Sequence, residues 1–207
     1  MKESTIVIIA LFSLAWFGGA YAQPGFSIQG GLLHDTPAQD TYERMEAGIG
    51  YVGNFGFDLY ERLGLEIGVL HSTHDYLFVI EANAIREKDA EKNTIFFKVR
   101  AIPYKIGKAE FVLAAGPALF DISGVRRFEN RYDLEDGFSG WGAVLSFDMR
   151  YFVSQGLALT FYLSGNFVKY DQYTVNSIDF AYPGDLPGGD SVSWGLTVFH
   201  RIGMPKL

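Results

Sequence analysis

Apolar and polar residues alternate with a period of two along most of this 207-residue chain. The segment 139–152, SGWGAVLSFDMRYF, shows the pattern: Trp141 and Leu145 fall on one face, and Asp148 and Arg150 fall on the other. Successive side chains of a β-strand point to opposite faces of the sheet. The alternation therefore predicts a strand with one apolar face and one small or polar face.

The same pattern predicts eight strands, and no segment after residue 25 shows a helical period. The expected strands are 25–33, 47–60, 63–73, 94–104, 110–120, 138–152, 156–169 and 191–202. Most of them are longer than the roughly 5–6 residues of a usual soluble strand. Their length suits strands that cross a bilayer at a tilt, which need about 9–11 residues.

The connections between these strands alternate strictly in length. Three are short, namely Glu61–Arg62, 105–109 and 153–155, and four are long and polar, namely 34–46, 74–93, 121–137 and 170–190. In a meander, this order places all short turns at one end. Short periplasmic turns and long extracellular loops are typical of outer-membrane barrels. The predicted fold is all-β, an eight-stranded antiparallel up-and-down transmembrane β-barrel.

The two faces of the strands differ enough in composition to show which one meets lipid and which one lines the barrel interior. The apolar face is rich in Phe, Tyr and Trp, and we expect it to meet lipid, whereas the polar face lines a closed interior. A soluble lipocalin-like barrel would reverse the faces, and alternation alone permits that arrangement. The long strands, the aromatic residues and the loop asymmetry favour the membrane barrel.

Charged residues on the predicted inner face gather in the periplasmic half of the barrel. They are Asp58, Glu66, Lys98, Arg100, Glu110, Asp148, Arg150 and Arg201. Buried charges persist only when they are paired, and acids and bases are balanced in this set. An eight-stranded barrel is only wide enough for its own side chains or one small ligand. We therefore predict a network of ion pairs that plugs the lumen, rather than a gated ion path.

Composition narrows the remaining possibilities. The net charge of −7 argues against a nucleic-acid partner, and the chain has no cysteine. The four histidines are scattered and the acidic run 133–136 lacks the spacing of a calcium loop, so neither a metal nor a cofactor is expected. The start of the chain, with Lys2, an apolar core and a final Ala20-Tyr21-Ala22, predicts a signal peptide over 1–22 and a mature domain over 23–207.

Two short runs carry a resemblance to a known family. They are the run VRAIPY at 99–104 and, after a short turn, the run AAGPAL at 114–119. With the eight-segment plan, they resemble the small porin-like outer-membrane β-barrel family that includes OmpA- and OmpX-type barrels. The resemblance covers 23–207 and implies insertion into the outer membrane of a Gram-negative-type bacterium. Such barrels usually end on an aromatic residue, whereas eight residues follow Phe199 here.

One group of residues has the composition of an enzyme site. Some barrels of this family modify lipid A with Ser and His near the outer rim, and Ser72 and His74 lie at the outer end of a predicted strand, both facing inward. A serine nucleophile needs a base within hydrogen-bond reach and a third group that orients the base. No third group is evident, so we interpret Ser72 and His74 as rim residues.

The sequence therefore predicts a non-enzymatic, monomeric barrel with a structural or interaction role. Its partners would be the membrane lipid and an extracellular molecule bound by the four long connections. Two alternatives stay open: a narrow channel or carrier for a small solute or hydrophobic ligand, and a lipid A-modifying enzyme.

Overall fold

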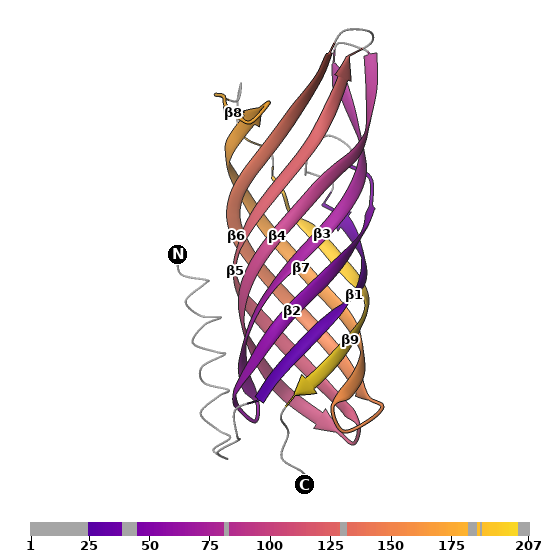
Figure 1. Cartoon of the computed structure of the whole chain (residues 1–207), viewed down its shortest axis with the longest axis vertical. Coiled ribbons are helices and arrows are strands. Elements are labelled where there is room, and N and C mark those ends of the chain that lie inside the picture. The colour runs from indigo at the N-terminus through magenta and orange to yellow at the C-terminus, as the bar shows by residue number, and fades with distance from the viewer. Residues whose placement is uncertain are drawn as a thin grey trace.

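The computed structural model describes residues 25–38, 45–80, 83–128, 132–181, 186 and 188–202, without the side chains of 76–89 and 125–134. In this part of the chain, eight long antiparallel strands close a barrel (Figure 1). They are β1 (Gly25–Pro37), β2 (Gly48–Tyr60), β3 (Leu63–Ile80), β4 (Asn83–Ile106), β5 (Ala109–Phe128), β6 (Tyr132–Phe152), β7 (Leu157–Val175) and β9 (Ser191–Ile202). A two-residue strand, β8 (Ile178–Asp179), pairs with the end of β7.

Closure comes from the pairing of the first strand with the last. In β1, Ser27 lies between Gly56 of β2 and Arg201 of β9, and β9 pairs in turn with β7. Over the height of the closed ladder, every long strand thus has a neighbour on both sides, which satisfies the backbone hydrogen bonds there without an open sheet edge. The predicted eight-stranded meander is confirmed. None of the described residues lies in a helix long and apolar enough to cross a membrane.

The two ends of the barrel differ in the way that the connection lengths predicted. Short turns join β2 to β3, β4 to β5 and β6 to β7 at one end, where β1 also begins and β9 ends (Figure 1). At the opposite end the wall is uneven, because β3 to β6 extend well beyond β1, β2 and β9 (Figure 1).

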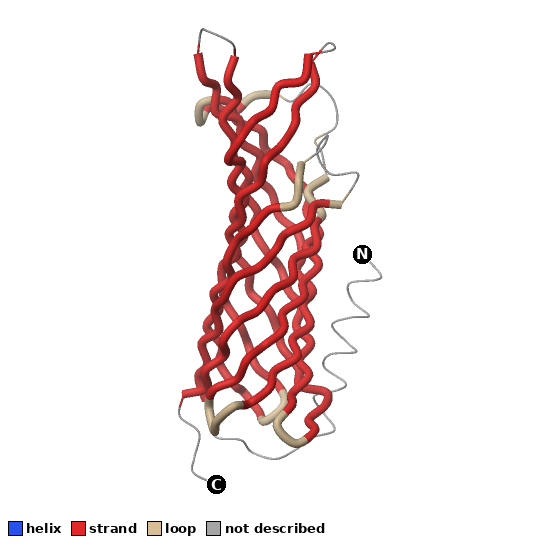
Figure 2. The backbone as a smooth tube through the Cα atoms, turned by 90° about the vertical axis from the view of Figure 1, so that its right-hand side faces the viewer, coloured by secondary structure: helices blue, strands red, loops and turns tan. Residues whose placement is uncertain are grey.

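The predicted ends of four strands are wrong, because most of the expected long connections 74–93 and 121–137 is strand. The β3–β4 ladder continues to the pair Ile80–Asn83, and the β5–β6 ladder continues to Phe128–Tyr132. Outside a membrane a strand needs no apolar face, since its backbone groups still pair across the ladder. The alternation of apolar residues therefore ends before the strands do. Above Glu91 and Ser123, the last pair between β4 and β5, the two hairpins splay apart (Figure 2).

The polarity of the barrel is opposite to that of a soluble protein. Leu32 and Leu196 on the outside are 71% and 72% exposed, whereas Arg100 and Arg150 on the inside are at most 1% exposed. Large exposed apolar side chains continue around all eight long strands. A contiguous apolar exterior of this extent needs lipid around it, because exposing so much apolar surface to water is very unfavourable. The predicted outward apolar face is confirmed, and the lipocalin-like alternative is wrong.

Candidate functional site in the barrel lumen

Glu66 of β3 is the centre of the charged part of the lumen. Its carboxylate accepts a hydrogen bond of 3.1 Å from Arg100 and one of 3.4 Å from Arg150, and Lys98 Nζ lies 3.4 Å from its other oxygen. Glu66 is 3% exposed, and the three cations are at most 1% exposed. Three strands, β3, β4 and β6, thus supply the cations and the carboxylate that meet inside the barrel.

The other predicted charges extend this network around the wall. Arg100 also pairs with Asp58, and Arg150 donates to Asp148 at 3.0 Å. Arg201 donates to Glu110 at 3.1 Å. The structure therefore brings all eight predicted residues together in pairs of opposite charge. These eight residues are four carboxylates and four cations, so their formal charges cancel, which lowers the cost of burying them.

Polar and aromatic neighbours also contact this network. Ser27 accepts a hydrogen bond of 3.0 Å from Arg100, and Gln29 accepts one of 3.1 Å from Arg150. The Arg150 guanidinium lies 4.0 Å from the centre of the Phe199 ring, a cation–π contact. The hydrogen bonds and the ring contact replace part of the water that these charges lose.

An apolar layer lies above the charges and fills the middle of the lumen. Val52, Leu70, Phe96 and Tyr162 are each at most 2% exposed and belong to one packed cluster. The sequence interpretation missed this layer, because it treated the whole inner face as polar. A signal was present: several of these residues adjoin an outward apolar residue, as in Val69-Leu70 and Ile95-Phe96. Paired apolar residues of this kind indicate that both faces of the strand are apolar at that height.

Ser72 and His74 belong to a second polar cluster, above the apolar layer. Ser72 Oγ lies 2.8 Å from His74 Nε2, and Asp35 Oδ2 lies 3.3 Å from each of these atoms. Lys92 Nζ donates to Asp35 at 3.0 Å. Sequence reasoning missed Asp35 and Lys92 because both fell in ranges expected to be loops. The alternation does continue from Ser27 through Leu33 to Asp35, and it would have placed Asp35 on the inner face.

The geometry of this cluster differs from that of a catalytic triad. In a catalytic triad, one ring nitrogen of the histidine bonds to the serine and the other ring nitrogen bonds to the carboxylate. Here Asp35 and Ser72 meet the same nitrogen, and His74 Nδ1 lies 3.0 Å from the backbone oxygen of Glu46. Ser72 is fully buried. The cluster ties β1, β3 and β4 to the segment that enters β2.

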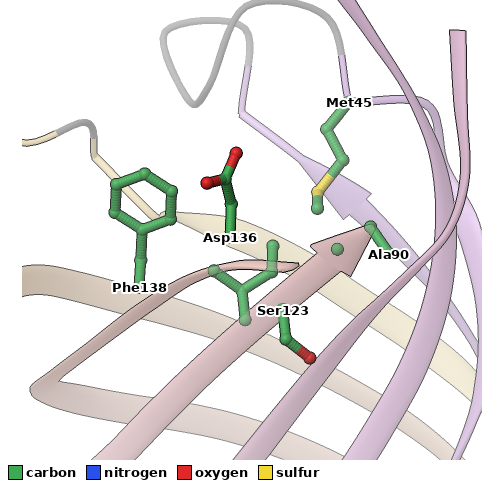
Figure 3. Close-up of a pocket in the computed structure, with 7 residues that line it drawn as sticks. Met45, Ala90, Ser123, Asp136 and Phe138 are labelled. Carbon is green, nitrogen blue, oxygen red and sulfur yellow. The ribbon is translucent and has the colours of Figure 1, made fainter. Parts of the chain in front are cut away.

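Apolar side chains gather at the outer mouth of the lumen. Met45, Ala90, Ile122 and Phe138 surround a pocket there, with Asp136 beside it (Figure 3). The pocket holds about 10 Å³, which is the space of roughly one water molecule. Among the described residues, no group of three or more histidine and acidic side chains is placed to hold a metal ion.

Comparison with known proteins gives structural relatives alone. No family model and no curated protein matches the sequence. The outer membrane protein OprG from Pseudomonas aeruginosa is similar in structure, with a TM-score of 0.66 over 88% of this chain and 98% of its own, at 10% identity. This is the fold of the small outer-membrane β-barrels.

Two further solved structures share this fold. A major outer membrane protein from Thermus thermophilus gives a TM-score of 0.62 over 86% of this chain and 99% of its own, at 16% identity. The second is Ail, the attachment invasion locus protein of Yersinia pestis, in complex with the heparin analogue sucrose octasulfate. It gives a TM-score of 0.54 over 87% of this chain and 99% of its own, at 10% identity. The barrel therefore has the fold and the apolar exterior of outer-membrane proteins, in which the short turns face the periplasm.

Proposed function

We propose that the protein is a non-enzymatic outer-membrane barrel with a closed lumen, which acts at the cell surface through its extracellular connections. The observation that carries this proposal is the filling of the lumen. A neutral charge network, an apolar layer and the Asp35 cluster follow one another from the periplasmic end to the mouth.

The apolar layer is the main obstacle to an ion. An ion that enters from the periplasm would have to displace Glu66 or its cations, and would then lose its hydration between Leu70, Phe96 and Tyr162. Moving a charge into such a setting is very unfavourable unless a partner compensates it. This supports a plug instead of a channel.

The extracellular end offers a surface on which a partner would bind. The hairpin of β7 and β8 exposes Ile178 and Phe180, at 62% and 53%, beside a hollow of about 320 Å³ lined by Tyr173 and Leu186. Exposed apolar side chains on an extracellular hairpin, next to a hollow, are typical of interaction sites. The fold shared with Ail, which was solved with a bound heparin analogue, supports an interaction role for a barrel of this size.

Conductance tests the closed lumen directly. Purified protein inserted in a planar bilayer should give no steady current between about −100 and +100 mV, a range that includes resting membrane potentials. A protein sample heated before insertion serves as the control for leakage caused by detergent. Discrete, lasting current steps from the unheated sample alone would contradict the plug and favour the channel alternative.

A further inference from the structure

The outer face of β4 to β7 carries a sharp border between apolar and polar side chains. Ile95, Leu119 and Trp141 are neighbours across three strands and are 55%, 62% and 59% exposed. Two residues nearer the extracellular end, each of these strands carries a polar side chain instead. These polar residues are Asn93, Asp121 and Ser139, which are again neighbours across the strands. Gln172 of β7 pairs with Ser139 and extends the polar row. The border lies on the lipid-facing exterior, where acyl chains give way to head groups.

The wall is hollowed at this border. A groove of about 350 Å³ runs along it, lined by both rows together with Phe120, Gly140 and Asp171. The register shifts between the pairs Ser139–Gln172 and Gly140–Tyr170, so Asp171 is an extra residue in a β-bulge. Bulges re-aim side chains and are frequent at barrel rims. The volume falls within the range of about 300–1,000 Å³ that small-molecule sites have.

The groove presents hydrogen-bond donors and acceptors in a fixed arrangement. His71 Nδ1 lies 2.7 Å from the side-chain oxygen of Asn93, and Ser139 donates to the side-chain oxygen of Gln172 at 3.0 Å. Both amides therefore use their oxygens within the wall, and their NH₂ groups are left as donors. The carboxylates of Asp121 and Asp171 supply acceptors. Among the described residues, no lysine or arginine lines the groove.

We propose that this groove binds the sugar head group of a glycolipid of the outer leaflet. Sugar hydroxyls both donate and accept, so they suit two amide donors beside two carboxylates. A phosphate placed in the groove would instead face Asp121 and Asp171 with no cation among the lining residues. The acyl chains of the same lipid would lie on Ile95 and Leu119, and the Trp141 ring would cover the junction, as aromatic residues do at membrane interfaces.

Binding of defined lipids tests the groove. Full-length protein in detergent micelles is titrated with an acylated glucosamine disaccharide that lacks phosphate, and with phosphatidylethanolamine and phosphatidylglycerol, and is followed by native mass spectrometry. We expect the disaccharide lipid to bind at least tenfold more tightly than either phospholipid. The double variant Asp121→Ala/Gln172→Ala should bind it about tenfold more weakly, as expected for the loss of two net hydrogen bonds.

Matched controls separate the groove from general lipid binding. Trp194 is also exposed on the outside, on β9, where it stacks on His34. Trp141→Leu should therefore weaken binding, and Trp194→Leu should not. Lys169 is the cross-strand neighbour of Trp141. A phosphorylated form of the disaccharide lipid is therefore titrated as well. The proposal is overturned if Lys169→Gln abolishes binding of that form while Asp121→Ala/Gln172→Ala binds it like the parent. It is also overturned if the phospholipids bind as tightly as the disaccharide lipid. Should the double variant fail to fold, Asn93→Ala replaces it, with the same expected direction.

Discussion

Glu66 is the residue on which the charge network of the lumen depends. It is the carboxylate that Lys98, Arg100 and Arg150 share. Glu66→Leu would leave these buried cations short of a partner, which costs about 3–5 kcal/mol when a buried pair is broken. We expect the free energy of unfolding to fall by that amount in urea titrations of the protein refolded into lipid vesicles.

The periplasmic end of the barrel supplies the control for this change. Glu61 pairs with Lys105 at 3.6 Å, but its side chain is 52% exposed, so water screens the pair. Glu61→Ala should change the free energy of unfolding by less than about 1 kcal/mol. Equal losses from Glu61→Ala and Glu66→Leu would show that burial of the network does not matter for stability.

Single residues were predictable where the alternation was unbroken. The inward positions of Glu66, Asp148 and Arg150 follow from period two alone, because the neighbouring residues on each side are apolar. Lys92 could not be placed, since its flanking residues are polar and give no apolar face to count from. Asp35 was missed for a different reason: the alternation reaches it, but the strand was predicted to end at residue 33. The pairing of individual cations with carboxylates depends on strand register and tilt. The alternation within one strand does not reveal how that strand is aligned with its neighbours.

Gly50 shows how tightly the strands approach one another. A Cβ on Gly50 would lie 1.9 Å from the backbone oxygen of His71 on β3, whereas a Cβ on Gly53 of the same strand would meet nothing within 4 Å. Gly50→Ala should therefore destabilise the barrel by about 1–3 kcal/mol, the usual cost of overpacking. Gly53→Ala should leave the free energy of unfolding unchanged or raise it slightly, because glycine weakens a strand.

The same vesicle-bound urea titrations measure both variants. If Gly50→Ala and Gly53→Ala unfold at the same urea concentration, the close approach of β2 and β3 is not a constraint on the sequence. A lower unfolding midpoint for Gly53→Ala alone would contradict the register of this strand pair.

At the level of elements, the number and order of the strands were predictable and their outer ends were not. Lipid imposes the apolar alternation only over the height of the membrane, so sequence periodicity measures the spanning part of a strand. Beyond it, β3 to β6 continue for as long as their ladders pair, with no such demand on side chains. The short turns, in contrast, were predictable because they directly join two spanning segments.

The whole molecule has a closed ladder around a filled core, and this predicts how it behaves in detergent. SDS unfolds a protein by entering its apolar interior and unpaired edges, but here the apolar surface already faces outward and the eight long strands leave no edge between β1 and β9. Protein from an outer-membrane fraction should therefore stay folded in SDS at room temperature, and migrate faster on a gel than the same sample after boiling. Glu66→Leu should lose the fast-migrating form at a lower temperature than the parent, because the ladder stays intact while the core loses its central carboxylate. A chain that fractionates away from the outer membrane, or that migrates identically before and after boiling, would be incompatible with an inside-out barrel.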